Sequence, residues 1–171
     1  MYFFTADEHL GHTNILKYND RPWDTVEEMD EGIIRRFNFA VAPGDTTVHA
    51  GDFCWLNNKK DVYKTYVSRL NGSHIFLRGS HDHWLPDSAK YIWRKRIDGE
   101  LIMVGHYAMR VWECSHYNSW QLFGHSHGRL NTVGKQFDIG VDNYNYYPVP
   151  FDRIKSIMKF KPNNFNYVGD K

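Results

Sequence analysis

The sequence predicts a single α/β domain spanning residues 1–171, in which two β-sheets lie between layers of helices as a four-layer α/β/β/α sandwich. Three observations support this prediction. In the first half, short apolar runs alternate with amphipathic helical patterns. In the second half, apolar runs follow one another with turn signals between them. Several runs end in His or Asp, which places polar side chains beyond the carboxyl ends of strands.

The first half has the alternation of a β-α-β-α-β unit. Buried strands are predicted at residues 2–6, 46–50 and 73–77. Helices are predicted at residues 13–18, 26–39 and 59–70. Thr25 and Glu28 have the spacing of a capping box, which marks the start of the second helix. Asn71-Gly72 has the residues of a left-handed helix stop and ends the third.

The second half consists mainly of strands. They are predicted at residues 91–97, 100–104, 120–123 and 135–141. Asp98-Gly99 separates the first two runs by two residues, which indicates a hairpin. A last helix is predicted from Pro150 and Asp152 to about residue 159, and residues 161–171 are expected to form a loosely held tail.

Composition limits the classes of partner and compartment. Lys and Arg number 21 and Asp and Glu 20, a net charge of +1, so a nucleic-acid partner is not favoured and would need a local patch such as the cations at residues 90–96. The two cysteines, Cys54 and Cys114, indicate a reducing cytoplasm, the host's if a phage encodes the chain. The start lacks a signal-peptide pattern, and no run reaches the roughly 20 apolar residues of a membrane helix.

Imidazoles and carboxylates at the predicted strand ends indicate a metal centre. The candidate residues are Asp7, His9, Asp52, His81, Asp82, His106, His125 and His127. Each motif alone is ordinary, since an Asp-x-His is often a helix cap and a Gly-Asp a simple turn; their joint occurrence makes the metal interpretation stronger. Nitrogen and oxygen ligands suit Mn²⁺, Fe²⁺, Zn²⁺ or Ni²⁺. The set exceeds the needs of one ion, which favours two ions sharing a carboxylate.

The order of these motifs resembles the calcineurin-like metallophosphoesterases, in particular their small single-domain branch in bacteria and phages. That family has D-x-H, G-D, G-N-H-[DE], a lone H, and G-H-x-H. The corresponding segments here are Asp7-Glu8-His9, Gly51-Asp52, Gly79-Ser80-His81-Asp82, Gly105-His106 and Gly124-His125-Ser126-His127. The resemblance extends from residue 1 to about residue 159.

The resemblance implies a role for each motif. Asp7, His9 and His127 would hold a first metal and Asp52 would bridge it to a second, held by His106, His125 and the residue at position 80. A metal-bound hydroxide would attack phosphorus. His81 would protonate the leaving oxygen or stabilise the transition state, with Asp82 orienting it. Mn²⁺ is the expected metal, and Fe, Ni or Zn are alternatives.

Ser80 departs from the family pattern, which has asparagine there. A neutral serine hydroxyl is shorter and a poorer ligand, so the second metal is expected to bind more weakly or through a water. The alternatives are a change introduced to disable catalysis, or a catalytically impaired scaffold that keeps its metals.

The predicted substrate is a small phosphate ester or nucleotide. The short chain leaves no room for a cap insertion, so the cleft is expected to be open and a phosphodiester is favoured over a monoester. Arg78, His12 and His116 are the candidates for substrate contact. A nuclease of the same fold is the remaining alternative. The sequence makes no prediction about oligomeric state.

Overall fold

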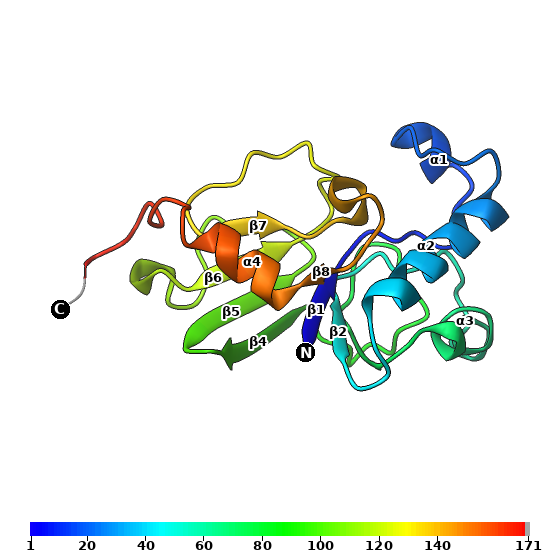
Figure 1. Cartoon of the computed structure of the whole chain (residues 1–171), viewed down its shortest axis with the longest axis horizontal. Coiled ribbons are helices and arrows are strands. Elements are labelled where there is room, and N and C mark those ends of the chain that lie inside the picture. Colours follow the sequence, from blue (N-terminus) through cyan, green and yellow to red (C-terminus); the bar gives the residue numbers. More distant parts are fainter. Residues whose placement is uncertain (170–171) are drawn as a thin grey trace.

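Two four-stranded β-sheets form the centre of the molecule in the computed structural model, which describes residues 1–169 (Figure 1). The first sheet has the order β3-β2-β1-β8, with bounds Ser73–Phe76, Thr46–His49, Tyr2–Thr5 and Val149–Pro150. The second has the order β4-β5-β6-β7, with bounds Ile92–Ile97, Glu100–Gly105, Trp120–Phe123 and Gln136–Asp138. The predicted α/β domain with two sheets is therefore confirmed.

Strand direction brings the polar motifs together. In the first sheet β1, β2 and β3 are parallel, and the short β8, which the sequence did not predict, is antiparallel to β1. In the second sheet β4 and β5 form the predicted hairpin, whereas β5, β6 and β7 are parallel rather than joined by hairpins. In each sheet the carboxyl ends of the parallel strands meet at one edge.

The α-helices are α1 (Ile15–Tyr18), α2 (Val26–Ala40), α3 (Lys59–Thr65) and α4 (Phe151–Met158). The Thr25 side chain accepts a hydrogen bond from the Glu28 amide at 3.2 Å, which confirms the predicted cap of α2. The helix predicted for residues 59–70 ends at Thr65 and continues as a 3₁₀ turn, Val67–Arg69. Between them Tyr66 leaves helical geometry, and its buried hydroxyl donates to Asp30.

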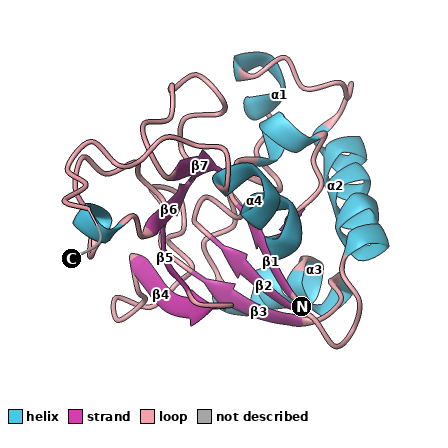
Figure 2. Ribbon diagram, turned by 60° about the vertical axis from the view of Figure 1, so that its left-hand side comes forward, coloured by secondary structure: helices cyan, strands magenta, loops and turns pink. Residues whose placement is uncertain are grey.

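A continuous apolar core lies between the two sheets. The first sheet contributes Phe4 and Val48, the second contributes Ile102 and Leu122, and α4 adds Ile154. A second cluster forms where α2 and α3 pack on the other side of the first sheet, as Figure 2 shows. On the second sheet, the buried side chains of Gln121 and Gln136 bind the main chain of residues 107–109. A loop therefore covers this part of the outer face.

The segment after α4 is anchored, in contrast to the loose tail expected for residues 161–171. Asn164 is buried and its side-chain amide donates to the carbonyls of Ser115 and Ser119 at 2.9 and 3.0 Å. The Val168 amide donates to the carbonyl of His116. Residues 170 and 171 lie outside the described part of the chain. None of the helices described is long and apolar enough to cross a bilayer.

Candidate metal centre

The five sequence motifs meet where the carboxyl ends of the parallel strands converge. Five of the candidate ligands in this region have left-handed backbone conformations, with positive φ angles at Asp7, His9, Asp52, His125 and His127. Such conformations are uncommon outside glycine and cost free energy, and they concentrate at functional sites where the fold over-determines them. The chain therefore stores backbone strain at these motifs.

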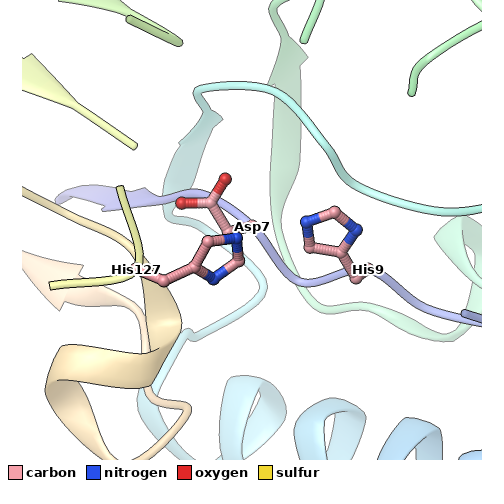
Figure 3. Close-up of side chains that lie close together, drawn as sticks. All are labelled: Asp7, His9 and His127. Carbon is pink, nitrogen blue, oxygen red and sulfur yellow. The ribbon is translucent and has the colours of Figure 1, made fainter. Parts of the chain in front are cut away.

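One group of possible ligands, here called the first ligand group, consists of Asp7, His9 and His127. Their ligand atoms lie within 4.8 Å of one another, as Figure 3 illustrates. Asp7 and His9 are buried and His127 is half-buried. The His125 amide donates to both Asp7 carboxylate oxygens at 3.0 and 2.8 Å, which holds that carboxylate in place.

The second ligand group consists of Asp52, His106 and His125, whose ligand atoms also lie within 4.8 Å of one another. The Nδ1 of His106 lies 3.0 Å from the carbonyl oxygen of Ala50. A carbonyl can only accept, so this nitrogen carries the proton and the Nε2 of His106 is left with a free lone pair. That Nε2 lies 3.3 Å from Asp52 Oδ2 and 3.2 Å from His125 Nδ1.

Asp52 lies between the two groups. Its Oδ2 is 3.7 Å from the Nε2 of His9 and 3.3 Å from the Nε2 of His106. Within residues 1–169, the buried Nε2 of His9 has no hydrogen-bond partner. A buried polar atom without a partner is costly, and a bound cation is one way to satisfy it. The position of Asp52 is thus compatible with a carboxylate shared by two ions.

Electrostatics also fit a cation. Burial and the nearby carboxylate of Asp52 raise the pKa of Asp7 well above its ordinary value. Burial acts to raise the pKa of Asp52 too. The hydrogen bonds that its carboxylate makes with His106 and with the backbone amide of His81 nevertheless hold this pKa well below its usual range. Burial lowers the pKa of His9 to about 2, which keeps its imidazole neutral. His9 is thus in the neutral form that metal binding requires, and a bound cation would favour the ionised form of Asp7.

Two glycines allow the motifs to approach closely. A Cβ added at Gly79 would lie 2.3 Å from Asp52 Oδ1, and one at Gly124 would lie 2.7 Å from Asp7 Oδ2. Both contacts are too short for any side chain. These glycines are needed so that each carboxylate can be packed against the next strand-end loop.

A pair that the sequence did not predict, the half-buried Asp142 and the buried Arg21, supports the first ligand group. Asp142 Oδ2 lies 2.7 Å from His127 Nδ1, and the side-chain nitrogen of Asn19 lies 2.6 Å from the same atom. Bonded to the carboxylate, Nδ1 carries the proton, and Nε2 is then the nitrogen that can bind a cation. Asp142 also accepts from Nε and Nη2 of Arg21 at 2.9 and 3.0 Å. Arg21 in turn donates to the carbonyls of Asp7 and Glu8. Arg21 is thus a structural residue that joins the loop after β1 to Asp142.

The Gly79-Ser80-His81-Asp82 motif differs from expectation at its last residue. Asp82 was expected to orient His81, but its buried carboxylate instead accepts hydrogen bonds from the amides of Asp52, Phe53 and Gly79 and from the Trp84 indole. A carboxylate that already receives these bonds serves to join two strand-end loops.

His81 and Ser80 both adjoin Asp52. The His81 amide donates to Asp52 Oδ1 at 2.8 Å, and its Nε2 lies 3.9 Å from Asp52 Oδ2. His9, Asp52 and His81 thus form a third possible ligand group. The Ser80 hydroxyl donates to the Asp52 carboxylate at 3.0 Å.

These residues open onto a cleft of about 440 Å³. Its lining residues are His9, His12, Asn14, Ile15, Tyr18, Asn19, Asp52, Trp55, Ser80, His81, His125, His127 and Arg129. Of the three predicted substrate contacts, His12 lies in the cleft. Arg78 instead donates to the carbonyls of Leu85 and Pro86, and His116 lies in the 3₁₀ turn Ser115–Tyr117. Arg78 and His116 do not line this cleft, and their contact with a substrate stays a prediction.

Comparison with known proteins supports the fold. No protein-family model matches the chain. The uncharacterized protein MJ1445 of Methanocaldococcus jannaschii is 28% identical over 164 residues, which cover 92% of this chain and 90% of that protein. The crystal structure of a protein of unknown function, AQ665 from Aquifex aeolicus, has a TM-score of 0.71 at 22% identity and covers 92% of this chain and 98% of its own. This likeness shows a shared fold.

A more distant solved structure is a conserved uncharacterized protein of Streptococcus pneumoniae, described as a predicted phosphoesterase. It is 12% identical, covers 81% of this chain and 70% of its own, and has a TM-score of 0.39. A likeness at that level carries no argument about this chain.

Proposed function

We propose that this protein is a metal-dependent phosphoesterase with two divalent ions, Mn²⁺ being the preferred metal, that hydrolyses a phosphodiester. The observation that carries the proposal is the position of Asp52 between the Nε2 of His106 and the buried Nε2 of His9, which has no hydrogen-bond partner among residues 1–169. Asp7, His9 and His127 would hold one ion and His106 and His125 the other, with Asp52 shared. The order of the motifs, which resembles the calcineurin-like metallophosphoesterases, supports the same assignment.

Two ions in this position would activate a water and neutralise the charge on phosphate oxygens. The chain itself contributes His81, whose half-buried ring lines the cleft beside Asp52. The hydrogen bond from the His81 backbone amide to Asp52 fixes the loop that carries His81, so the ring lies beside the proposed site of reaction. In this proposal, His81 donates a proton to the leaving oxygen. A positioned general acid contributes about 10²–10⁴ in rate, so His81→Ala should lose that much turnover and keep its metals.

The preference for a diester rests on access. The cleft of about 440 Å³ opens directly to solvent at His125, whose side chain is exposed. A second substituent on phosphorus can therefore extend out of the cleft.

The proposal also includes three features of the whole protein. They are the four-layer α/β/β/α arrangement, the single-domain organisation and a cytoplasmic location.

The function is tested by hydrolysis with defined metal loading. Protein stripped with chelator and reloaded with Mn²⁺ should turn over bis-p-nitrophenyl phosphate faster than p-nitrophenyl phosphate, and elemental analysis should find two ions per chain. Faster turnover of the monoester would reverse the assignment of substrate. If the protein binds its metals but turns over neither compound, it is a metal-binding scaffold and not a phosphoesterase.

That scaffold is the second candidate function, and Ser80 is the observation that favours it. Its hydroxyl donates to Asp52, where the related enzymes have an asparagine. A nuclease is not favoured, because the basic residues of β4 already have partners. Arg94 pairs with Glu113 at 2.8 Å, and Arg96 donates to the Gly99 carbonyl at 2.7 Å.

A further inference from the structure

An exposed tryptophan stands beside the cleft and takes no part in the chemistry above. Trp55 is 46% exposed, although it follows Asp52 by only three residues. Its indole ring stacks on the His12 imidazole, with centroids 3.9 Å apart and planes 14° apart. His12 is itself buried against His9, at 3.3 Å between their Nδ1 atoms. The indole is thus held in a fixed plane, and ordering it around a ligand would cost little entropy.

The indole separates the cleft from a smaller hollow. This hollow has a volume of about 110 Å³ and is lined by Trp55, Asn57, His81 and His83. The rings of Trp55 and His81 lie 4.8 Å apart between centroids, at 44°. His81 is the residue assigned to the leaving oxygen. Whatever group that oxygen carries would therefore extend along His81 toward this hollow.

The chemistry of the hollow selects among leaving groups. Three of its four lining side chains are aromatic rings, and the fourth, Asn57, offers amide donors and a carbonyl acceptor. Among the described residues, those that line it include no Lys, Arg, Asp or Glu. Apart from the proton that His81 gives to the leaving oxygen, the proposal places no counter-charge there for a second phosphate. A planar ring with polar edges matches both the stacking surface and the amide.

We propose that the hollow is a subsite for a leaving alcohol that carries a planar aromatic ring, a nucleoside, whose nucleobase stacks on Trp55 with its polar edge at Asn57. The inference rests on the proposed phosphoesterase function and specifies its substrate class as a nucleoside phosphate ester. A simple aryl ester shares the planar ring but lacks the polar edge. Binding of a nucleoside ester should therefore depend on Asn57, whereas binding of an aryl ester should not.

The test uses three phosphonates in which a methylene group replaces the ester oxygen, so that no turnover occurs. Ethylphosphonate has no ring, benzylphosphonate has a simple ring, and the adenosine analogue has a nucleobase. Dissociation constants are measured by calorimetry with the Mn²⁺-loaded protein. Quenching of tryptophan fluorescence by free adenosine gives a second readout that needs no metal. The variants are Trp55→Leu, Trp55→Phe and Asn57→Ala, with Tyr63→Leu as a control at an exposed aromatic residue on α3.

The adenosine analogue should bind roughly 5- to 100-fold more tightly than ethylphosphonate, the range expected for stacking of one base. Trp55→Leu should bring that ratio close to one and abolish quenching by adenosine, Trp55→Phe should keep most of the ratio, and Tyr63→Leu should keep all of it. A loss with Asn57→Ala confined to the adenosine analogue identifies a nucleobase. If Asn57→Ala lowers the affinity for both ring compounds equally, or for neither, the ligand of the hollow is a simple aryl group.

Equal affinity for all three compounds in the native protein would overturn the subsite, as would a Trp55→Leu variant that keeps the ratio. Failure of the proposed function looks different: the protein would then bind ethylphosphonate no better with Mn²⁺ than without it, whatever the result with adenosine.

Discussion

The first ligand group, Asp7, His9 and His127, is more deeply buried than the second, and charged side chains support it. In the second group, Asp52, His106 and His125, the side chain of His125 is exposed and His106 is backed by a main-chain carbonyl. His127 by contrast is held by Asp142, which is held by Arg21. A histidine ligand keeps its orientation when its other nitrogen is fixed, and a carboxylate partner also raises its basicity. The first group is therefore expected to bind its ion more tightly.

The largest effect is expected where the two groups meet. Asp52→Asn replaces the carboxylate that lies 3.7 Å from His9 Nε2 and 3.3 Å from His106 Nε2. The amide offers one neutral oxygen and cannot balance two divalent charges, so both ions should be lost together with activity. The loss should exceed the 10- to 100-fold effects typical of residues behind a ligand. Elemental analysis after gel filtration measures it, and full occupancy by both ions would refute the shared carboxylate.

The next effect should distinguish the groups. Asp142→Asn removes the charge behind His127 and should weaken the more tightly bound ion about 10- to 100-fold while the other ion changes little. Chelator competition resolves the two binding steps. Because Arg21 is completely buried and would lose its counter-charge, denaturant unfolding without metal reports the accompanying loss of stability. Asp152→Asn, an exposed position on α4, is the matched control. Equal weakening of both ions would remove the asymmetry proposed for the centre.

In contrast to these losses, one substitution is expected to raise the affinity for the second ion. Ser80→Asn provides a carbonyl oxygen where the serine hydroxyl now donates to Asp52 at 3.0 Å. The added ligand should tighten the weaker ion and leave the tighter one unchanged, which narrows the difference between the groups. Titration with Mn²⁺ compares the two proteins at equal concentration. If stoichiometry and both affinities stay the same, Ser80 is not the cause of a weak second ion.

The strand-end motifs could be predicted from the sequence because their ligands are local to predicted strands, and parallel strands bring such ends together. Asp142 and Arg21 could not, since they are 121 residues apart and nothing near Asp142 in the sequence marks it as a partner of His127. The direction in which each side chain of a motif points could not be predicted from the sequence either. Arg78 and Asp82 lie near strand ends as predicted, but the turns that carry them direct the Arg78 guanidinium to the Leu85 carbonyl and the Asp82 carboxylate to the Asp52 amide.

The second sheet shows the same limit for the fold. Residues 98 and 99 correctly predicted the hairpin, because turn chemistry is local. The parallel pairing of β5 with β6 and of β6 with β7 depends on long connections that carry no such signal. The segment 161–169 was expected to be loose because it lacks a periodic apolar pattern, yet hydrogen bonds from the Asn164 side chain and the Val168 amide anchor it.

The effect expected to change metal binding least concerns how the first ligand group is anchored to the fold. Asp30 on α2 accepts hydrogen bonds from the Gly11 amide at 3.0 Å and the Tyr66 hydroxyl at 2.9 Å, and so fixes the loop that carries Asp7 and His9. Burial raises the pKa of Asp30 from 3.8 to about 6. A carboxyl with a raised pKa binds more protons in the folded state than in the unfolded state between these two values. Its contribution to stability is therefore complete below pH 3.8 and is lost as the pH rises through 6.

Asp30→Asn should remove this pH dependence, because the amide is neutral throughout and can still accept from Gly11. In chelator, the wild-type free energy of unfolding should fall between pH 4 and pH 7 relative to that of Asp30→Asn, by up to about 3 kcal/mol for a shift of two pKa units. Urea denaturation at several pH values measures the difference, with the exposed Asp61→Asn as control. Parallel pH profiles for the wild type and Asp30→Asn would mean that Asp30 stays ionised. The loop of the first ligand group would then be held by a buried charge, and its support would resemble that of His127 by Asp142.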